Sequence, residues 1–260
     1  MSEKALDATN PMECAPRNTA PTGAQLHRPA TSHAAEPLLA ANDLSIRYFG
    51  CDEWAVRNFS FALWEGEILC LRGRSGVGKS TVTAAMMGML PVWGAEAEGS
   101  LLYRGTDLLH CGERELRDIR WKEIALVPQS SMNAFNPVYT VRKTLREMMW
   151  LENRRISRDE MREREERLME IVHLDRSALD CYAHEMSGGM KQRAAIALAM
   201  VYTPRLLILD EATTGLDIKV QADVLGTILQ LRRENNMTIL FISHDAQLGD
   251  KISDRRVEMQ

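Results

Sequence analysis

The chain has 260 residues, of which 45% are hydrophobic and 26% charged, which are ordinary proportions for a globular protein. Its net charge of −4 gives no reason to expect a nucleic acid as an obligatory partner. Five scattered cysteines without a C-x-x-C pair argue against a disulfide framework or a zinc site and fit a reducing cytosol. Because no apolar run approaches the roughly 20 residues of a membrane helix, we expect any role at a membrane to come through a partner.

The first part of the chain divides into a tail and a region of strands. Residues 1–36 are rich in Ala, Pro and Thr and poor in large apolar side chains, so we predict a disordered tail before a folded domain over residues 37–260. The stretch WAVRNFSFALWEGEILCLRG alternates apolar and polar residues, which is typical of strands. The segment KSTVTAAMMGML is predicted to be a helix that ends at Pro91, and EGSLLYRGTDL a short strand pair.

Residues 141–174 have the pattern of helices. Ser157-x-x-Glu160 has the form of a capping box, and the charge run RDEMREREER that follows Ser157 is predicted to face solvent. Further along, RLLILDE and MTILFISHD are short apolar runs separated by the predicted helix VQADVLGTILQLRRE. Strands buried on both faces have this composition, so the predicted fold class is α/β, with a parallel sheet, crossover helices and a helical insertion.

A phosphate-binding pattern, G-x-x-x-x-G-K-[ST], lies between a predicted strand and a predicted helix. It comprises Gly73, Arg74, Ser75, Gly76, Val77, Gly78, Lys79 and Ser80, with Thr81 next. The glycines let backbone N–H groups point at phosphate oxygens, and the helix N-terminus adds partial positive charge. Lys79 is expected to reach the β- and γ-phosphates and the Ser80 hydroxyl to ligate Mg²⁺. The alternative is a chance glycine-rich turn.

An acidic pair, Asp210 and Glu211, ends the apolar run RLLIL. In a parallel α/β sheet, the carboxyl edge of the strands is where ligands bind. Asp210 is suited to hold Mg²⁺ through water, and Glu211 to polarise an attacking water as a general base. The alternative is a surface pair that merely ends a strand, but a phosphate loop in the same chain favours the catalytic interpretation.

A second glycine turn stands in the stretch AHEMSGGMKQR. Ser187, Gly188 and Gly189 precede an apolar helical run, so a hydroxyl and backbone amides at a helix start could hold an anion. The alternative is a flexible turn before the helix.

Six motifs occur in one order: GRSGVGKST, VPQ, MSGGMKQR, LLILDE, TGLD and FISHD. This set resembles the nucleotide-binding domain of ATP-binding cassette (ABC) proteins, from residue 38 to the C-terminus. The resemblance implies a P-loop ATPase fold with a mainly parallel core sheet, an N-terminal antiparallel part and a helical subdomain at about residues 139–203. The stretch IRWKEIALVPQSSMNAFNPVYTV, together with Met190, is similar to the peptide/nickel importer branch.

The resemblance also implies roles for single residues outside the phosphate loop. Gln129 matches the Q-loop glutamine, which contacts Mg²⁺ or the water, and His244 matches the switch histidine near the γ-phosphate. Asp217 matches the D-loop aspartate, which communicates across a dimer. Tyr48 matches the aromatic residue that stacks on adenine, with Phe49 next to it.

The implied function is that of an ATPase subunit, dependent on ATP and Mg²⁺, which energises an importer for peptides, nickel or a related small solute. A second ABC ATPase subunit, identical or a paralogue, is implied, so that the turn at Ser187 binds the γ-phosphate of the opposing subunit. Two transmembrane permease subunits would contact residues 133–139, and an extracytoplasmic solute-binding protein would deliver the solute. The chain would then lie at the cytoplasmic face of the cell membrane.

Three departures from the family pattern bear on these expectations. Ala212 stands where this branch usually has Pro, and Gly215 replaces the common Ala before Leu-Asp. Neither supplies a catalytic atom, so small effects are expected. The chain also ends soon after His244, whereas family members continue with further strands and helices, so the C-terminal strands of the family are expected to be missing and a sheet edge exposed. Two alternatives therefore remain: a soluble ABC ATPase acting on ribosomes or DNA, and a truncated, non-catalytic remnant.

Overall fold

The computed structural model describes residues 36–129 and 135–260. The predicted tail, except for its last residue, lies outside the described residues, and so do the first two residues of the predicted permease contact at 133–139.

Two sheets of different kinds organise the chain. One sheet is parallel, with the order β6 (Ile124–Val127), β7 (Leu206–Asp210), β8 (Thr238–Ser243), β3 (Ile68–Arg72) and β9 (Arg255–Glu258). The other is antiparallel, with the order β2 (Val56–Leu63), β1 (Leu39–Tyr48), β4 (Ala95–Tyr103) and β5 (Thr106–Asp107). The predicted α/β fold class is therefore confirmed.

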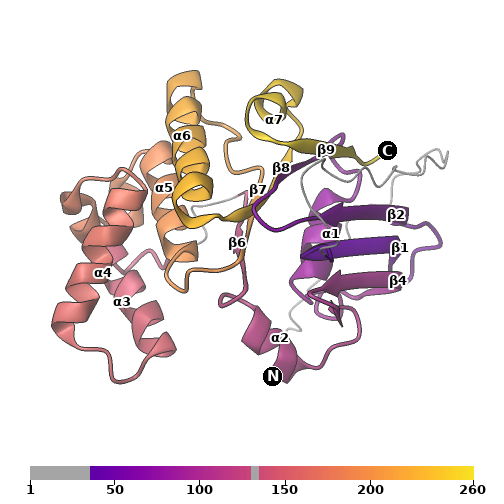
Figure 1. The fold of residues 1–260 in the computed structure, drawn as a ribbon, viewed down its shortest axis with the longest axis horizontal. Coiled ribbons are helices and arrows are strands. Elements are labelled where there is room, and N and C mark those ends of the chain that lie inside the picture. Colours follow the sequence, from indigo (N-terminus) through magenta and orange to yellow (C-terminus); the bar gives the residue numbers. More distant parts are fainter. Residues whose placement is uncertain (1–35, 130–134) are drawn as a thin grey trace, which may run out of the picture.

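Helices cover both faces of the parallel sheet. They are α1 (Lys79–Met86), α2 (Glu113–Ile119), α3 (Val141–Glu152), α4 (Arg158–Ile171), α5 (Gly188–Ala199), α6 (Ile218–Asn235) and α7 (Ala246–Ile252), with two 3-10 helices, η2 (Arg176–Asp180) and η3 (Ala183–Glu185). Figure 1 shows α3 and α4 at the opposite end of the molecule from β1, β2 and β4.

The strands of the parallel sheet alternate between two apolar cores. In β7, Leu207 and Leu209 face the core shared with α3–α6, while Leu206 and Ile208 face the core shared with α1 and the antiparallel sheet. Every residue of β7 is buried. This double burial explains why the run is apolar without interruption in the sequence.

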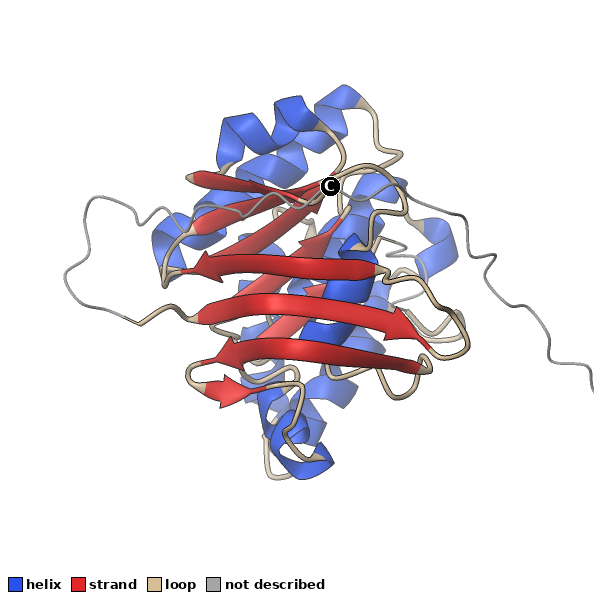
Figure 2. Ribbon diagram, turned by 90° about the vertical axis from the view of Figure 1, so that its right-hand side faces the viewer, coloured by secondary structure: helices blue, strands red, loops and turns tan. Residues whose placement is uncertain are grey.

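The antiparallel sheet lies in front of α1 in Figure 2. Val82 and Met86 of α1 belong to the same core as Leu44 of β1 and Ile208 of β7, so the helix is packed between the two sheets. The phosphate loop that precedes α1 is thereby placed at the junction of the two sheets.

Helix α1 ends at Met86, four positions before Leu90, the last residue of the predicted helix that Pro91 was expected to stop. Gly88 adopts a φ of 61°, and the N–H groups of Gly88 and Met89 donate to Ala85 O and Ala84 O, at 2.9 and 2.8 Å. This is the glycine-terminated Schellman motif, which satisfies the last carbonyl groups of a helix. The stop is therefore set by Gly88 rather than by Pro91.

Helix α4 begins at the predicted cap but does not expose its whole charge run. Ser157 Oγ accepts a hydrogen bond from Glu160 N at 3.1 Å, as a helix cap does. The prediction that RDEMREREER faces solvent is wrong at Glu165, whose exposed fraction is 0%. Arginines from α3 form ion pairs with this buried carboxylate. The sequence of α4 alone could not predict these partners, because they lie on another helix.

The residues after His244 form α7 and then β9, which pairs in parallel with β3. β3 therefore has a partner on both of its sides. Among the described residues, no helix is both long and apolar enough to span a bilayer.

Two helical glycines provide a matched test of packing around α6. A methyl group on Gly189 would lie 2.2 Å from Val220 Cγ1, whereas one on Gly226 would meet nothing within 4 Å. We expect Gly189→Ala to lower the free energy of unfolding by about 1–3 kcal/mol through overpacking. Gly226→Ala should raise it by about 0.5–1 kcal/mol, because alanine favours the helix interior. Urea unfolding of both variants measures the two effects, and stabilisation by both substitutions would contradict this packing.

Candidate nucleotide-binding site

The phosphate loop joins the end of β3 to the start of α1. Gly76 and Gly78 have φ values of 77° and 104°, in the left-handed region that favours glycine. A Cβ atom on Gly78 would lie 2.6 Å from Ala55 O, so the position has no room for a side chain. The loop conformation thus depends on glycine at these two positions.

Lys79 brings a buried positive charge to this loop. Its side chain is 5% exposed, and its Nζ donates to Gly73 O at 2.9 Å and to Arg74 O at 3.0 Å. The same Nζ lies 3.6 Å from Glu211 Oε1. The loop and the end of β7 are therefore adjacent, as the sequence motifs predict.

The Glu211 carboxylate is the meeting point of three segments. Besides Lys79, it accepts a hydrogen bond from Gln129 Nε2 at 2.8 Å on Oε2, and its Oε1 lies 3.3 Å from His244 Nδ1. Gln129 follows β6, and His244 follows β8, the strands on either side of β7. The Glu211 backbone has a φ of 49°, which is uncommon for a residue with a side chain and recurs at functional sites.

Asp210 is the last residue of β7 and is 8% exposed. Burial, with a further contribution from the negative charge of Glu211, raises its pKa from 3.8 to about 6, against the opposing effect of Lys79. Because burial disfavours the charged form of this carboxyl group, a cation placed beside it would stabilise that charged form.

The side chains predicted to hold Mg²⁺ have suitable chemistry. The Ser80 hydroxyl, the Gln129 amide and the Asp210 carboxylate all provide oxygen ligands, which Mg²⁺ prefers. Ser80 is exposed and directly follows Lys79. Because the ammonium group of Lys79 lies beside Glu211, the start of α1 and the end of β7 are adjacent at the candidate Mg²⁺ site. The residues present therefore fit the ion.

Tyr48, at the end of β1, is tied to the first turn of α1. Its hydroxyl lies 3.0 Å from Thr81 Oγ1, a hydrogen-bond distance. The neighbouring Phe49 is 65% exposed. Tyr48 is therefore held beside the helix that follows the phosphate loop, whereas the backbone N–H of Phe49 donates to Gly94 O at 2.7 Å.

The signature turn, which we define as Ser187, Gly188 and Gly189, begins α5. Ser187 is exposed, and its Oγ accepts a hydrogen bond from Met190 N at 3.3 Å, so the hydroxyl serves as the helix cap. A Cβ atom on Gly188 would lie 3.2 Å from Leu216, which places this turn against the segment that leads into α6.

Asp217 follows Leu216 and caps α6. Its Oδ1 accepts hydrogen bonds from Lys219 N and Val220 N at 3.1 and 3.0 Å. The preceding Gly215 has a φ of 78°, so the glycine that departs from the family pattern occupies a left-handed position that alanine would strain. The signature turn and Asp217 therefore belong to one surface.

The predicted site residues fall into two groups. The structure brings Lys79, Gln129 and His244 each into contact with Glu211, and Asp210 directly precedes Glu211 at the end of β7. Within the described ranges, no hydrogen bond or ion pair joins the signature turn to the phosphate loop. Sequence reasoning missed the contact between Gln129 and Glu211, because their separation along the chain carries no signal of it.

The raised pKa of Asp210 predicts how stability depends on pH in the ligand-free chain. The Asp210 carboxyl binds its proton more tightly in the folded than in the unfolded state, so its contribution to the free energy of unfolding falls by about 3 kcal/mol as pH rises from about 4 to 6 and above. Asp210→Asn removes this loss. Without divalent cations, the variant should exceed the parent in stability at pH 8 and match it near pH 4.

Asp118→Asn is the control with the opposite sign. The exposed Asp118 has a pKa lowered by its hydrogen bond to Lys122, so its substitution should give no gain at pH 8. Urea unfolding at pH values from 4 to 8 measures the stability of the parent and both variants. If the parent were as stable as Asp210→Asn at pH 8, the charged Asp210 carboxylate would not destabilise the folded state as proposed.

Comparisons with known proteins agree with this geometry. The family model described as "ABC transporter" matches residues 56–214. The oligopeptide transport ATP-binding protein OppD of Bacillus subtilis is 35% identical over 84% of this chain and 62% of its own length. The dipeptide transport ATP-binding protein DppD of Caldanaerobacter subterraneus subsp. tengcongensis is 39% identical over 76% of this chain and 63% of its own. The chain thus spans somewhat less than two thirds of these relatives.

A solved structure shares the fold. The ATP-binding cassette MJ0796, described in a dimeric post-hydrolysis state bound to ADP and Pi, has a TM-score of 0.75 and 23% identity, over 85% of this chain and 94% of that one. This likeness shows the fold alone. Since the family model covers more than half of the chain and the relatives match most of it at over 30% identity, the chain belongs to the ABC transporter family as one of its ATP-binding domains.

Proposed function

We propose that this chain is the ATP-hydrolysing subunit of an ABC importer and that its cargo is a peptide. The observation that carries the proposal is the position of the Glu211 carboxylate, in contact with Lys79, Gln129 and His244 at the edge of the parallel sheet. The relatives named for oligopeptide and dipeptide transport support peptide as cargo. Nickel or a related small solute is the alternative cargo.

In the proposed mechanism, the phosphate loop binds the β- and γ-phosphates of ATP through its backbone amides and Lys79. Ser80 and Gln129, with Asp210 through water, would hold Mg²⁺, which would supply positive charge to the phosphate oxygens. Glu211 accepts a proton from the attacking water, and His244 holds the γ-phosphate and that water in line. Tyr48 stacks on the adenine.

The signature turn acts on the ATP of a second cassette in this proposal. Ser187 and Gly188 are exposed at the start of α5, next to the Asp217 segment. In a two-fold symmetric dimer, the signature turn of each subunit can contact the phosphate loop of the other, so the same contact is made twice. The dimeric state described for MJ0796 is in keeping with this arrangement. The second subunit is either identical or a paralogue.

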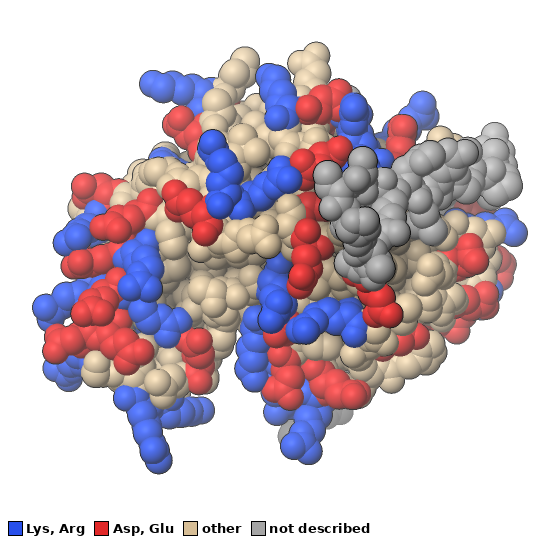
Figure 3. Space-filling model, in the orientation of Figure 1, with Lys and Arg blue, Asp and Glu red and all other residues tan. Residues whose placement is uncertain are grey.

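The remaining partners are two permease subunits and an extracytoplasmic solute-binding protein, with the chain at the cytoplasmic face of the membrane. Val138, 71% exposed, lies in the predicted permease contact, and Tyr182, 38% exposed, pairs with Thr140 directly after it, so both provide apolar surface there. The alternative of an ATPase acting on ribosomes or DNA has less support. The face seen in Figure 3 carries Lys and Arg interspersed with Asp and Glu, rather than the basic surface that nucleic-acid binding favours.

Glu211→Gln tests the general base. We expect the variant to bind ATP, to hydrolyse it at least about a hundredfold more slowly and to accumulate as an ATP-bound dimer, since proton transfer by a positioned base contributes this much. Phosphate release and size-exclusion chromatography measure the two effects. Glu113→Gln, at an exposed carboxylate of α2 that pairs with Arg120, is the control. Parental hydrolysis by Glu211→Gln would refute the assignment.

Gly188→Asp tests the action of the signature turn across the dimer. A carboxylate at this position would repel the phosphate of the opposing subunit, so hydrolysis should be lost while the isolated chain binds ATP with unchanged Kd. Gly188→Ala adds the same Cβ atom, 3.2 Å from Leu216, without the charge and should keep much of the activity. If Gly188→Asp instead abolished ATP binding by the isolated chain, the proposal of action in trans would be wrong.

A further inference from the structure

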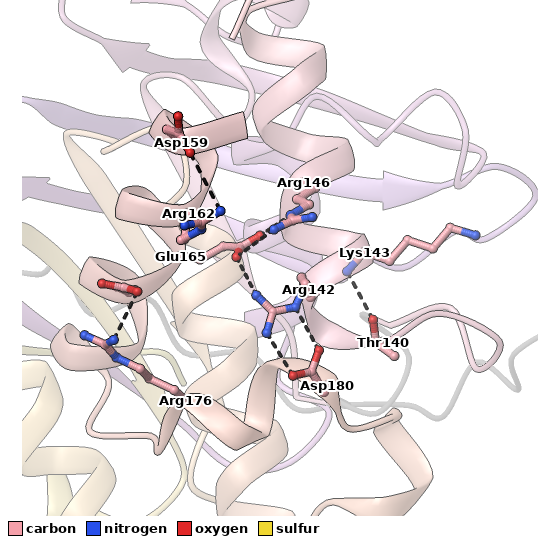
Figure 4. Close-up of polar contacts among 10 residues, drawn as sticks. Thr140, Arg142, Lys143, Arg146, Asp159, Arg162, Glu165, Arg176 and Asp180 are labelled. Carbon is pink, nitrogen blue, oxygen red and sulfur yellow. Dashed lines mark hydrogen bonds and ion pairs between the residues drawn. The ribbon is translucent and has the colours of Figure 1, made fainter. Parts of the chain in front are cut away.

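Four charged side chains form a network among α3, α4 and η2 (Figure 4). Arg142 and Arg146 lie one turn apart on α3, Glu165 is on α4, and Asp180 ends η2. Since residues four positions apart share a helix face, both arginines point to the same side of α3. The two positive and two negative charges balance within the network.

Arg142 is the only member that contacts both carboxylates. Its Nε and Nη2 donate to the two oxygens of Asp180, at 2.8 and 2.9 Å, and its Nη1 donates to Glu165 Oε2 at 2.7 Å. This paired geometry matches the planar guanidinium and is among the stronger hydrogen-bonding arrangements. We call this contact the Arg142–Asp180 pair.

Arg146 has a different role in the network. Its Nε contacts Glu165 Oε1, and its Nη2 donates to Glu165 Oε2 at 3.2 Å, so it compensates the carboxylate that is 0% exposed. Removing one partner of a buried charge is costly to stability. Asp180, by contrast, has a side chain 68% exposed, and its removal leaves no buried charge on its own element.

Backbone contacts extend the Arg142–Asp180 pair toward the signature turn. Val141 N donates to Cys181 O at 3.1 Å, and Thr140 forms an antiparallel bridge with Tyr182. Tyr182 N in turn donates to the Glu185 carboxylate at 2.8 Å, two residues before Ser187. The start of α3 is thus attached, step by step, to the segment that ends in the signature turn.

We propose that Arg142 is a positioning residue for the signature turn, acting through Asp180 to hold residues 180–187 against the start of α3. The inference rests on the proposed function, in which that turn completes the ATP site of a second cassette. Residues 135–139, the described part of the predicted permease contact, directly precede Thr140, the N-terminal cap of α3. A displacement of residues 135–139 would therefore reach the signature turn through this pair.

The test compares Asp180→Ala and Arg142→Lys with the control Arg146→Ala. Each is measured by hydrogen–deuterium exchange of residues 183–190, by kcat for ATP hydrolysis, by the ATP Kd of the isolated chain and by thermal unfolding. Asp180→Ala and Arg142→Lys should increase exchange at 183–190 and lower kcat about tenfold, equivalent to about 1.4 kcal/mol, with Kd unchanged. Arg146→Ala should reduce thermal stability more than Asp180→Ala and yet change exchange at 183–190 and kcat less.

Two results would overturn the inference. One is parental exchange at residues 183–190 in Asp180→Ala, or increased exchange with parental kcat. The other is an equal effect of Arg146→Ala on exchange and kcat, which would show a general structural role. A parent chain that hydrolyses no ATP would refute the proposed function instead, and in that case exchange at 183–190 alone decides whether Arg142 positions the turn.

Discussion

The contact of the Glu211 carboxylate with three separate segments is the constraint on which the site depends. β7 has no exposed residue, and its neighbours β6 and β8 run parallel to it, so all three strands end at one edge. Gln129 and His244 reach Glu211 from the ends of β6 and β8, and Lys79 reaches it from the first residue of α1. A change in the register of any of these strands would separate the four side chains.

The antiparallel sheet positions α1 and the phosphate loop. It buries α1 against the parallel sheet, and through Tyr48 and Thr81 it fixes the first turn of that helix. The backbone of Ala55, just before β2, limits the space beside Gly78. The phosphate loop is therefore shaped by contacts from both sheets, while the signature turn stands apart on α5, against the segment that carries Asp217.

Much of the fold could be predicted because its signals are local. Apolar runs with motifs at their ends identify β7 and β8, and glycines with a lysine identify the loop before α1. The predicted extension of α1 to Leu90, stopped by Pro91, was wrong because the turn at Gly88 ends the helix earlier with hydrogen bonds from Gly88 N and Met89 N.

Long-range contacts leave no such local signal. The burial of Glu165 depends on Arg142 and Arg146 from another helix, so a charged residue in a charged run was predicted to face solvent. The contact of Gln129 with Glu211 is equally distant in the chain. The preference for glycine at residue 215 becomes apparent only from its backbone angle, because its neighbours in the sequence do not require a left-handed turn.

The hydrogen bonds of Lys79 to Gly73 and Arg74 have a consequence for selectivity. A ligand that recruits this ammonium group must offer acceptors better than two neutral carbonyl oxygens, and charged oxygens form hydrogen bonds about twice as strong as neutral ones. A molecule without an anionic group offers Lys79 no hydrogen bond stronger than those it already donates to Gly73 O and Arg74 O. The loop would therefore favour anionic ligands over neutral ones.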